Sequence, residues 1–112
     1  MMDCIFCKIV KGDIPATVEY ETDELIVIND LNPQAPVHLL VIPKTHYSTL
    51  LDCDEAVVLG GLLEGVKEIA IRKGFADAGF RTVINTNKGG GQSVFHLHLH
   101  ILAGKGFSES IG

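Results

Sequence analysis

The seven residues 96–102, His-Leu-His-Leu-His-Ile-Leu, constrain the fold of this chain more than any other segment. Side chains on a β-strand point alternately to opposite faces. A strand here therefore presents three imidazoles on one face and buries Leu97, Leu99 and Ile101 on the other. Histidine titrates near physiological pH and serves as a base, a nucleophile or a metal ligand, so we interpret the row as functional rather than as a half-exposed strand alone.

The whole chain of 112 residues has the length and composition of one folded domain, which we expect to span residues 1–112. Its net charge of -5 argues against a nucleic-acid partner, because such surfaces need clustered Lys and Arg. No apolar run approaches the roughly 20 residues of a membrane span, so we expect no membrane partner. Three cysteines, an odd number, fit a reducing compartment, and we expect a cytoplasmic location.

Hydrophobic periodicity predicts an α+β domain. A short helix is expected over residues 4–10, where apolar residues recur at helical spacing and Gly12 follows as a stop signal. Strands are expected over residues 17–21, 25–30, 38–43, 80–86 and 95–103. The third is almost continuously apolar and should be central. Together these elements predict a five-stranded, mainly antiparallel sheet with one long and one short helix.

The long helix is expected to begin at Asp52, which can cap it together with Glu55, and to run to Lys73 before Gly74. It should bury one apolar face, made of Leu59, Leu62, Leu63, Val66 and Ala70. Three glycines inside it, Gly60, Gly61 and Gly65, each cost about 1 kcal/mol relative to alanine. Either a close neighbour requires them or the helix tolerates the cost.

A glycine-rich loop, residues 85–93, leads directly into the histidine row. Its three glycines leave backbone N–H groups uncovered, and such a nest can hold phosphate oxygens, with Ser93 and Asn85 adding side-chain donors. The alternative is a flexible connection between strands. The position of the loop beside the imidazoles favours phosphate binding, because one ligand would touch both.

The spacing of the three histidines limits their use as metal ligands. Alternate residues on a strand lie about 6.6 Å apart, so at most two of these imidazoles share one ion. At least one, most naturally the central His98, is left for chemistry. A neutral imidazole can attack phosphorus and form a phosphohistidine that water hydrolyses.

Cys4 and Cys7, with the spacing Cys-x-x-Cys, form half of a tetrahedral zinc site, and two of the five histidines would have to complete it. Two buried, reduced cysteines are the alternative. Cys53 has no visible partner, and we expect it only to pack.

Taken together, these residues resemble the histidine-triad (HIT) superfamily, whose signature His-φ-His-φ-His-φ-φ is matched by residues 96–102. The Hint-like branch of nucleoside phosphoramidases is the most similar. The resemblance extends over nearly the whole chain, through Cys-Ile-Phe-Cys-Lys-Ile at 4–9, Asp-Ile-Pro-Ala at 13–16, Pro-Gln-Ala-Pro-Val-His at 33–38, Val-Ile-Pro-Lys-x-His at 41–46 and Gly-Gln-Ser-Val-Phe-His at 91–96.

The resemblance implies an enzyme that hydrolyses purine nucleoside phosphoramidates, conjugates of AMP or GMP with an amine, through a nucleotidyl-histidine intermediate. His98 would be the nucleophile, with His100 and His38 flanking it to orient the phosphate and protonate the leaving group. The implied substrate-binding residues are Asn85, Gly91, Gln92 and Ser93 at the phosphate, Asp30 and Asn32 at the ribose, and Ile5, Phe6, Ile9, Ile28, Leu31 and Leu40 around the purine.

The resemblance also implies assembly and metal binding. Catalysis would need no cofactor, whereas a structural zinc would be held by Cys4, Cys7, His46 and His96. The protein would be a homodimer, with the long helix and residues 80–86 at the joint.

Three departures from the branch bear on substrate preference. Asn32 stands where Ser is frequent, Ile28 replaces an aromatic residue, and the chain ends without a Trp-Pro-Pro segment. Ala103 and Gly104 occupy the place where dinucleoside polyphosphate hydrolases often have Pro-Arg. That hydrolase activity is the second hypothesis. The third is a nucleotide-binding or zinc-binding interaction module with little turnover.

Overall fold

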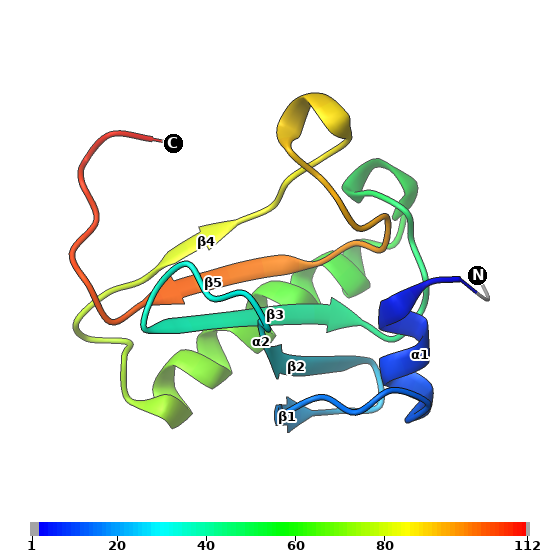
Figure 1. Cartoon of the computed structure of the whole chain (residues 1–112), viewed down its shortest axis with the longest axis horizontal. Coiled ribbons are helices and arrows are strands. Elements are labelled where there is room, and N and C mark those ends of the chain that lie inside the picture. The colour runs from blue at the N-terminus through cyan, green and yellow to red at the C-terminus, as the bar shows by residue number, and fades with distance from the viewer. Residues whose placement is uncertain (1–2, 112) are drawn as a thin grey trace.

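A computed structural model describes residues 3–111 of the chain (Figure 1). Five strands form one antiparallel sheet in the order β1-β2-β3-β5-β4. The elements, in chain order, are α1 (Ile5–Lys11), β1 (Val18–Glu21), β2 (Leu25–Asn29), β3 (Val37–Pro43), η1 (Leu50–Asp52), α2 (Ala56–Lys73), β4 (Arg81–Val83), η2 (Lys88–Gly90) and β5 (Leu99–Ala103). The predicted α+β architecture, with β3 at the centre, is confirmed. No helix within residues 3–111 could span a membrane.

The two faces of the sheet are covered by different helices. Alternate residues of β2 and β3 point to opposite sides, so Val27 and Val41 join the core cluster under α2, whereas Ile28 and Leu40 join a second cluster with Phe6 of α1. In Figure 1 the long helix α2 runs behind the sheet. The face that α1 covers is also the face on which the histidines lie.

The short helix α1 has well-defined ends. Cys4 is its N-cap, and the Cys4 sulfur accepts a hydrogen bond from the backbone N–H of Cys7. At the other end Gly12 adopts a left-handed conformation with φ of 83°, which glycine adopts without steric cost. Seven residues are too few for a stable isolated helix, so α1 depends on what its side chains contact.

The predicted start of the long helix is wrong. Asp52 caps a separate 3-10 turn together with Thr49, since its carboxylate accepts a hydrogen bond from the Thr49 backbone at 2.9 Å. The helix α2 begins at Ala56, after Glu55 as an N-cap without a side-chain hydrogen bond. Leu63, expected on the buried face, is 54% exposed. The predicted end at Lys73 and Gly74 is confirmed.

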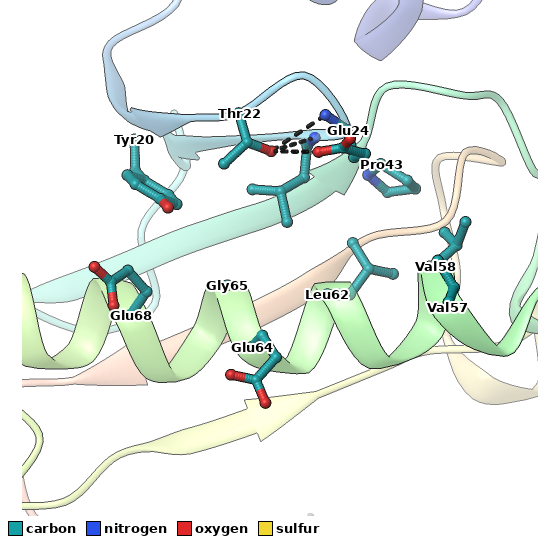
Figure 2. A pocket seen from close by; sticks show the side chains of 12 residues that line it. Tyr20, Thr22, Glu24, Pro43, Val57, Val58, Leu62, Glu64, Gly65 and Glu68 are labelled. Atoms are coloured by element: carbon teal, nitrogen blue, oxygen red, sulfur yellow. Dashed lines mark hydrogen bonds between the residues drawn. The ribbon is translucent and has the colours of Figure 1, made fainter.

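Only one of the three helix glycines has a close neighbour. A Cβ atom on Gly65 would lie 3.0 Å from a methyl group of Leu25, whereas one on Gly60 or Gly61 would meet nothing within 4 Å. Gly61 and Gly65 line a groove of about 440 Å³ between α2 and the β1–β2 hairpin, shown in Figure 2. This groove lies on the face opposite the histidines and contains none of them.

The strand β5 is shorter than predicted, and it begins after His96 and His98. Its ladder with β3 runs from Val37 opposite Ala103 to Val41 opposite Leu99. Continuing this register would place Pro43 opposite Leu97, and proline has no N–H to donate. Leu97 donates its N–H to the Tyr47 carbonyl instead. The alternation of side chains nevertheless persists, because Leu97 joins the α2 core while His96 and His98 contact Phe6.

Candidate active site and metal centre

A cavity of about 460 Å³ opens beside the histidines on the face covered by α1, and this volume is typical of small-molecule sites. Its walls come from α1, from β2 and β3 with their connecting loop, and from the glycine-rich loop. Every predicted catalytic and substrate-binding residue lines it except Gln92: His38, His98, His100, Asp30, Asn32, Asn85, Gly91, Ser93, Ile5, Phe6, Ile9, Ile28, Leu31 and Leu40.

Gln92 is buried and lies outside the cavity lining. Its side-chain amide donates to the carbonyls of Ser48 at 2.8 Å and Val94 at 3.0 Å, and its oxygen accepts from the N–H of Asn87 at 2.8 Å. These bonds fix the glycine-rich loop against the chain before η1. The geometry therefore gives Gln92 a part in holding the loop that carries Gly91 and Ser93.

Six further lining residues had no role assigned from the sequence. They are Ile14, Pro15, Ala16, Asn29, Gln34 and Val94. All but Asn29 belong to segments that matched the family pattern. The sequence therefore identified these segments but not which of their side chains line the cavity. Asn29 follows the apolar run of β2, and no local signal distinguishes it from an ordinary strand end.

The His98 ring is held by one backbone bond. Its Nδ1 lies 2.7 Å from the carbonyl oxygen of His96, so Nδ1 carries the proton and donates it. The Phe6 ring packs edge-on against His98, with centroids 5.1 Å apart. Burial lowers the pKa of His98, while the bond to His96 and the charge of Asp30 oppose that shift. His98 is therefore neutral at pH 7, with a lone pair on Nε2.

A second group of side chains lies beside His98, with the His98 and His100 ring centroids 4.9 Å apart. His38 Nε2 is 2.9 Å from His100 Nδ1 and 3.3 Å from a carboxylate oxygen of Asp30. The backbone N–H of Gln34 donates to His38 Nδ1 at 2.9 Å. Burial, followed by the neighbouring His98 and His38 rings, lowers the pKa of His100 to about 4.

A separate cluster brings together the four predicted metal ligands. Donor atoms of Cys4, Cys7, His46 and His96 all lie within 4.8 Å of one another. The sulfur of Cys4 is 3.2 Å from His96 Nδ1, and that of Cys7 is 3.4 Å from His46 Nδ1. His38 and His100 lie outside this cluster. As the strand spacing predicted, the triad does not converge on one ion.

The donor set fits a tetrahedral metal ion. Zn–S bonds of about 2.3 Å and Zn–N bonds of about 2.0 Å place neighbouring ligand atoms roughly 3.3–3.8 Å apart, close to the separations found here. His96 Nε2 lies 2.8 Å from the Pro43 carbonyl oxygen. Because a carbonyl only accepts, Nε2 carries the proton and Nδ1 has the free lone pair that a metal requires.

The antiparallel sheet, the two helices and the histidine row define a histidine-triad fold. The model of the HIT domain matches residues 11–107, and the chain belongs to the HIT family. It is 50% identical over 104 residues to Protein HitA of Neisseria gonorrhoeae, covering 91% of this chain and 96% of that protein. It is 37% identical over 105 residues to the purine nucleoside phosphoramidase of Escherichia coli K12, covering 92% and 88%.

One solved structure bears on the metal cluster. A zinc-bound histidine triad family protein from Mycobacterium smegmatis superposes with a TM-score of 0.85 at 37% identity, covering 96% of this chain and 79% of that one. The family thus contains a member with zinc, and this chain has a four-donor cluster suited to it.

Proposed function

We propose that this protein hydrolyses purine nucleoside phosphoramidates, with His98 as the nucleophile. The observation that carries the proposal is the His98 ring, whose Nδ1 is held by the His96 carbonyl while the ring lines a cavity of nucleotide size. A fixed ring with a bare Nε2 is what nucleophilic attack on phosphorus needs. The 37% identity to a purine nucleoside phosphoramidase supports this substrate class.

The cavity offers a distinct place to each part of a purine nucleotide. Apolar side chains at one end, Ile5, Phe6, Ile9, Ile28, Leu31 and Leu40, suit a flat base. The Asp30 carboxylate can accept bonds from ribose hydroxyls, with Asn32 beside it. Asn85, Gly91 and Ser93 offer donors to the phosphate next to His98, in keeping with the predicted nest.

The reaction then has two displacements at phosphorus. First, His98 Nε2 forms a bond to phosphorus as the bond from phosphorus to the amine breaks, and the amine leaves after taking up one proton. Water then attacks the nucleotidyl-histidine: its oxygen forms a bond to phosphorus as the bond from phosphorus to His98 Nε2 breaks. The proton that the water releases balances the one that the amine took up. His100 and His38 flank the reacting group, where a ring N–H can stabilise charge developing on the phosphoryl oxygens.

A comparison of wild type with His98→Ala on AMP-amine conjugates tests the proposal. We expect turnover to fall by at least about 10³-fold, because alanine has no lone pair with which to attack phosphorus. Rapid quenching with labelled substrate should trap a nucleotidyl adduct on wild type and on a His100→Asn control, and none on His98→Ala. Equal turnover by wild type and His98→Ala would refute the assignment.

Two other functions make different predictions for the same assays. A dinucleoside polyphosphate hydrolase would show the higher kcat/KM on polyphosphates rather than on phosphoramidates. An interaction module would bind nucleotide tightly with negligible turnover on both. The phosphoramidase is favoured because Ala103 and Gly104 stand where polyphosphate hydrolases often have Pro-Arg.

We further propose that the Cys4, Cys7, His46 and His96 cluster holds a structural zinc ion. The ion would supply a crosslink between α1, the segment after β3 and the histidine segment, with no part in the chemistry at phosphorus. Because Phe6 and its neighbours on α1 form one wall of the cavity, this crosslink would also hold that wall in place.

We also propose a homodimer. The strand β4 lies at the edge of the sheet, and α2 exposes apolar side chains, among them Leu63 at 54% and Ile71 at 66%. An open edge with an exposed apolar surface favours pairing with a second copy. Sedimentation equilibrium should give about 24 kDa for a C2 dimer, twice the 12.1 kDa of the chain. A monomer at micromolar concentration would refute this.

A further inference from the structure

We infer that the backbone amide of Gln34 is a positioning group, which fixes the tautomers of His38 and His100 so that His100 presents a protonated Nε2 to the substrate. The catalytic consequence rests on the proposed function, whereas the tautomers themselves do not. The evidence is a chain of three hydrogen-bonding groups that starts at a donor which cannot reverse its direction.

The first link is the bond from Gln34 to His38. The backbone N–H of Gln34 lies 2.9 Å from His38 Nδ1. A backbone N–H can only donate, so His38 Nδ1 must be the unprotonated nitrogen of its ring. A neutral imidazole has one proton, and in His38 that proton is therefore on Nε2.

The second link is the contact between the two rings. His38 Nε2 lies 2.9 Å from His100 Nδ1. Two N–H groups cannot face each other at that distance, so the protonated His38 Nε2 donates and His100 Nδ1 accepts. Asp30, at 3.3 Å from the same His38 nitrogen, is a second acceptor for the same proton. His100 must therefore carry its own proton on Nε2.

The third link is the exposure of the remaining nitrogens. Among residues 3–111, no side-chain nitrogen or oxygen is both buried and without a hydrogen-bond partner. The His100 ring lines the cavity, and its Nδ1 is already occupied by His38. Its Nε2–H is thus left for a ligand. The adjacent His98 ring, 4.9 Å away between centroids, has the opposite arrangement, with Nδ1 protonated and Nε2 bare.

The two neighbouring rings therefore offer complementary groups to one phosphoryl centre. His98 offers a lone pair to phosphorus, and His100 offers an N–H to an oxygen or to the leaving nitrogen. If His38 had the other tautomer, His100 would have to donate from Nδ1 and would present a lone pair to the anionic phosphate. That arrangement would repel the substrate instead of binding it.

The loop between β2 and β3 is built to present the Gln34 amide. The Asp30 carboxylate accepts from the N–H of Asn32 at 2.8 Å, and the Gln34 side chain donates to the Asn32 carbonyl at 3.2 Å. Pro33 and Pro36 on either side restrict the backbone. The active group is the main-chain N–H, so side-chain comparison cannot detect it.

Nitrogen-15 spectra of histidine-labelled wild-type protein without substrate test the tautomers directly. We expect unprotonated Nδ1 and protonated Nε2 signals for both His38 and His100, and the reverse for His98, whose Nδ1 donates to the His96 carbonyl. A protonated Nδ1 on His38 would overturn the proposal. This measurement uses no substrate, so it stands apart from whether phosphoramidates are hydrolysed.

Two variants then test whether Gln34 sets the tautomer. Gln34→Pro removes the N–H, and Gln34→Ala retains it as the matched control. We expect the ratio of the two His38 tautomers to shift by up to about tenfold in Gln34→Pro, the equivalent of one backbone hydrogen bond. The shift should be much smaller in Gln34→Ala, which keeps the N–H and loses only the side-chain bond to the Asn32 carbonyl. On AMP-amine conjugates, kcat should fall with the population of the correct tautomer.

Replacing the backbone amide at position 34 with an ester removes the same N–H without the conformational restraints of proline. This ester protein provides the test if Gln34→Pro fails to fold. A shifted His38 tautomer in the ester protein supports the proposal. A pure Nε2-protonated His38 in the ester protein would overturn it, because Asp30 alone would then be sufficient.

Discussion

Two clusters of polar donors lie in this molecule, and by composition and distance they are similar. Cys4, Cys7, His46 and His96 form the first, and Asp30, His38 and His100 form the second. In each, the donor atoms lie within 4.8 Å of one another. Each donor set, four ligands or two histidines and a carboxylate, is known from zinc proteins.

The difference lies in the backbone group that one histidine of each cluster contacts. In the first cluster a carbonyl, that of Pro43, occupies the far nitrogen of His96, so the near nitrogen has a free lone pair. In the second an N–H, that of Gln34, occupies the far nitrogen of His38, so the near nitrogen carries a proton. Lone pairs that converge bind a cation, whereas donors that alternate with acceptors hold a proton in place. Whether a carbonyl or an N–H contacts the far ring nitrogen decides whether the near nitrogen can bind a metal ion or carries a proton.

The strongest test of the difference between the two clusters removes one donor side chain from each. Cys4→Ser should lower zinc affinity at least about 100-fold, since four ligands share an apparent binding energy of roughly 10–16 kcal/mol. Serine retains the helix cap, because its hydroxyl can also accept from the Cys7 N–H. Asp30→Asn, the matched change in the second cluster, should leave zinc content unchanged.

Elemental analysis and chelator competition on protein purified without added metal provide the measurement. One equivalent of zinc in wild type and in Asp30→Asn, with little in Cys4→Ser, is expected. A full equivalent in Cys4→Ser, or a second equivalent in wild type that Asp30→Asn removes, would contradict the distinction between the clusters.

We expect His100 of the second cluster to make the free energy of unfolding depend on pH. Burial and the neighbouring His98 and His38 lower the pKa of His100 to about 4, below the 6.5 of an exposed histidine. Between these values the unfolded chain binds more protons than the folded one, so acidification favours unfolding. Stability from this ring is complete above pH 6.5 and is lost as the pH falls to about 4.

The expected loss is about 2 kcal/mol, less than the full conversion because the ring is partly exposed. Urea unfolding at pH 7, 5.5 and 4.5 should show a shallower loss for His100→Asn than for wild type. The difference between the two curves cancels the contributions of groups that do not interact with His100. Parallel pH curves for the two proteins would show that His100 is not buried in its neutral form.

Much of the fold was predictable, because it rests on periodicity. The alternation over residues 96–102 placed Leu97, Leu99 and Ile101 in the core, and the apolar run before Pro43 identified the central strand. The start of the long helix was mispredicted for a physical reason. Asp52 with Glu55 is a good local cap, but Asp52 bonds to Thr49 and caps a different turn.

The candidate site was predictable at the level of residue types, and less so at the level of atoms. The family pattern identified most of the residues that line the cavity. The spacing of the triad excluded one ion bound by all three histidines, whereas their separate roles came from the resemblance. Two features depend on which atoms form hydrogen bonds rather than on residue type. Gln92, 44 residues from Ser48, is used inside its loop, and the amide of Gln34 acts through its backbone. Neither has a signature in residue identity.

The smallest expected effect concerns the outer partner of a metal ligand. His46 differs from His96 because its far nitrogen faces a hydroxyl, that of Ser48 at 3.4 Å, instead of a carbonyl. Partners of this kind typically contribute 10–100-fold to metal affinity, and a bond this long belongs at the lower end. Ser48→Ala should therefore weaken zinc binding by about tenfold, with Thr45→Ala, an exposed change in the same segment, as the control. Equal zinc affinity in both variants would mean that packing alone orients His46, and that only the carbonyl behind His96 selects a lone pair in this cluster.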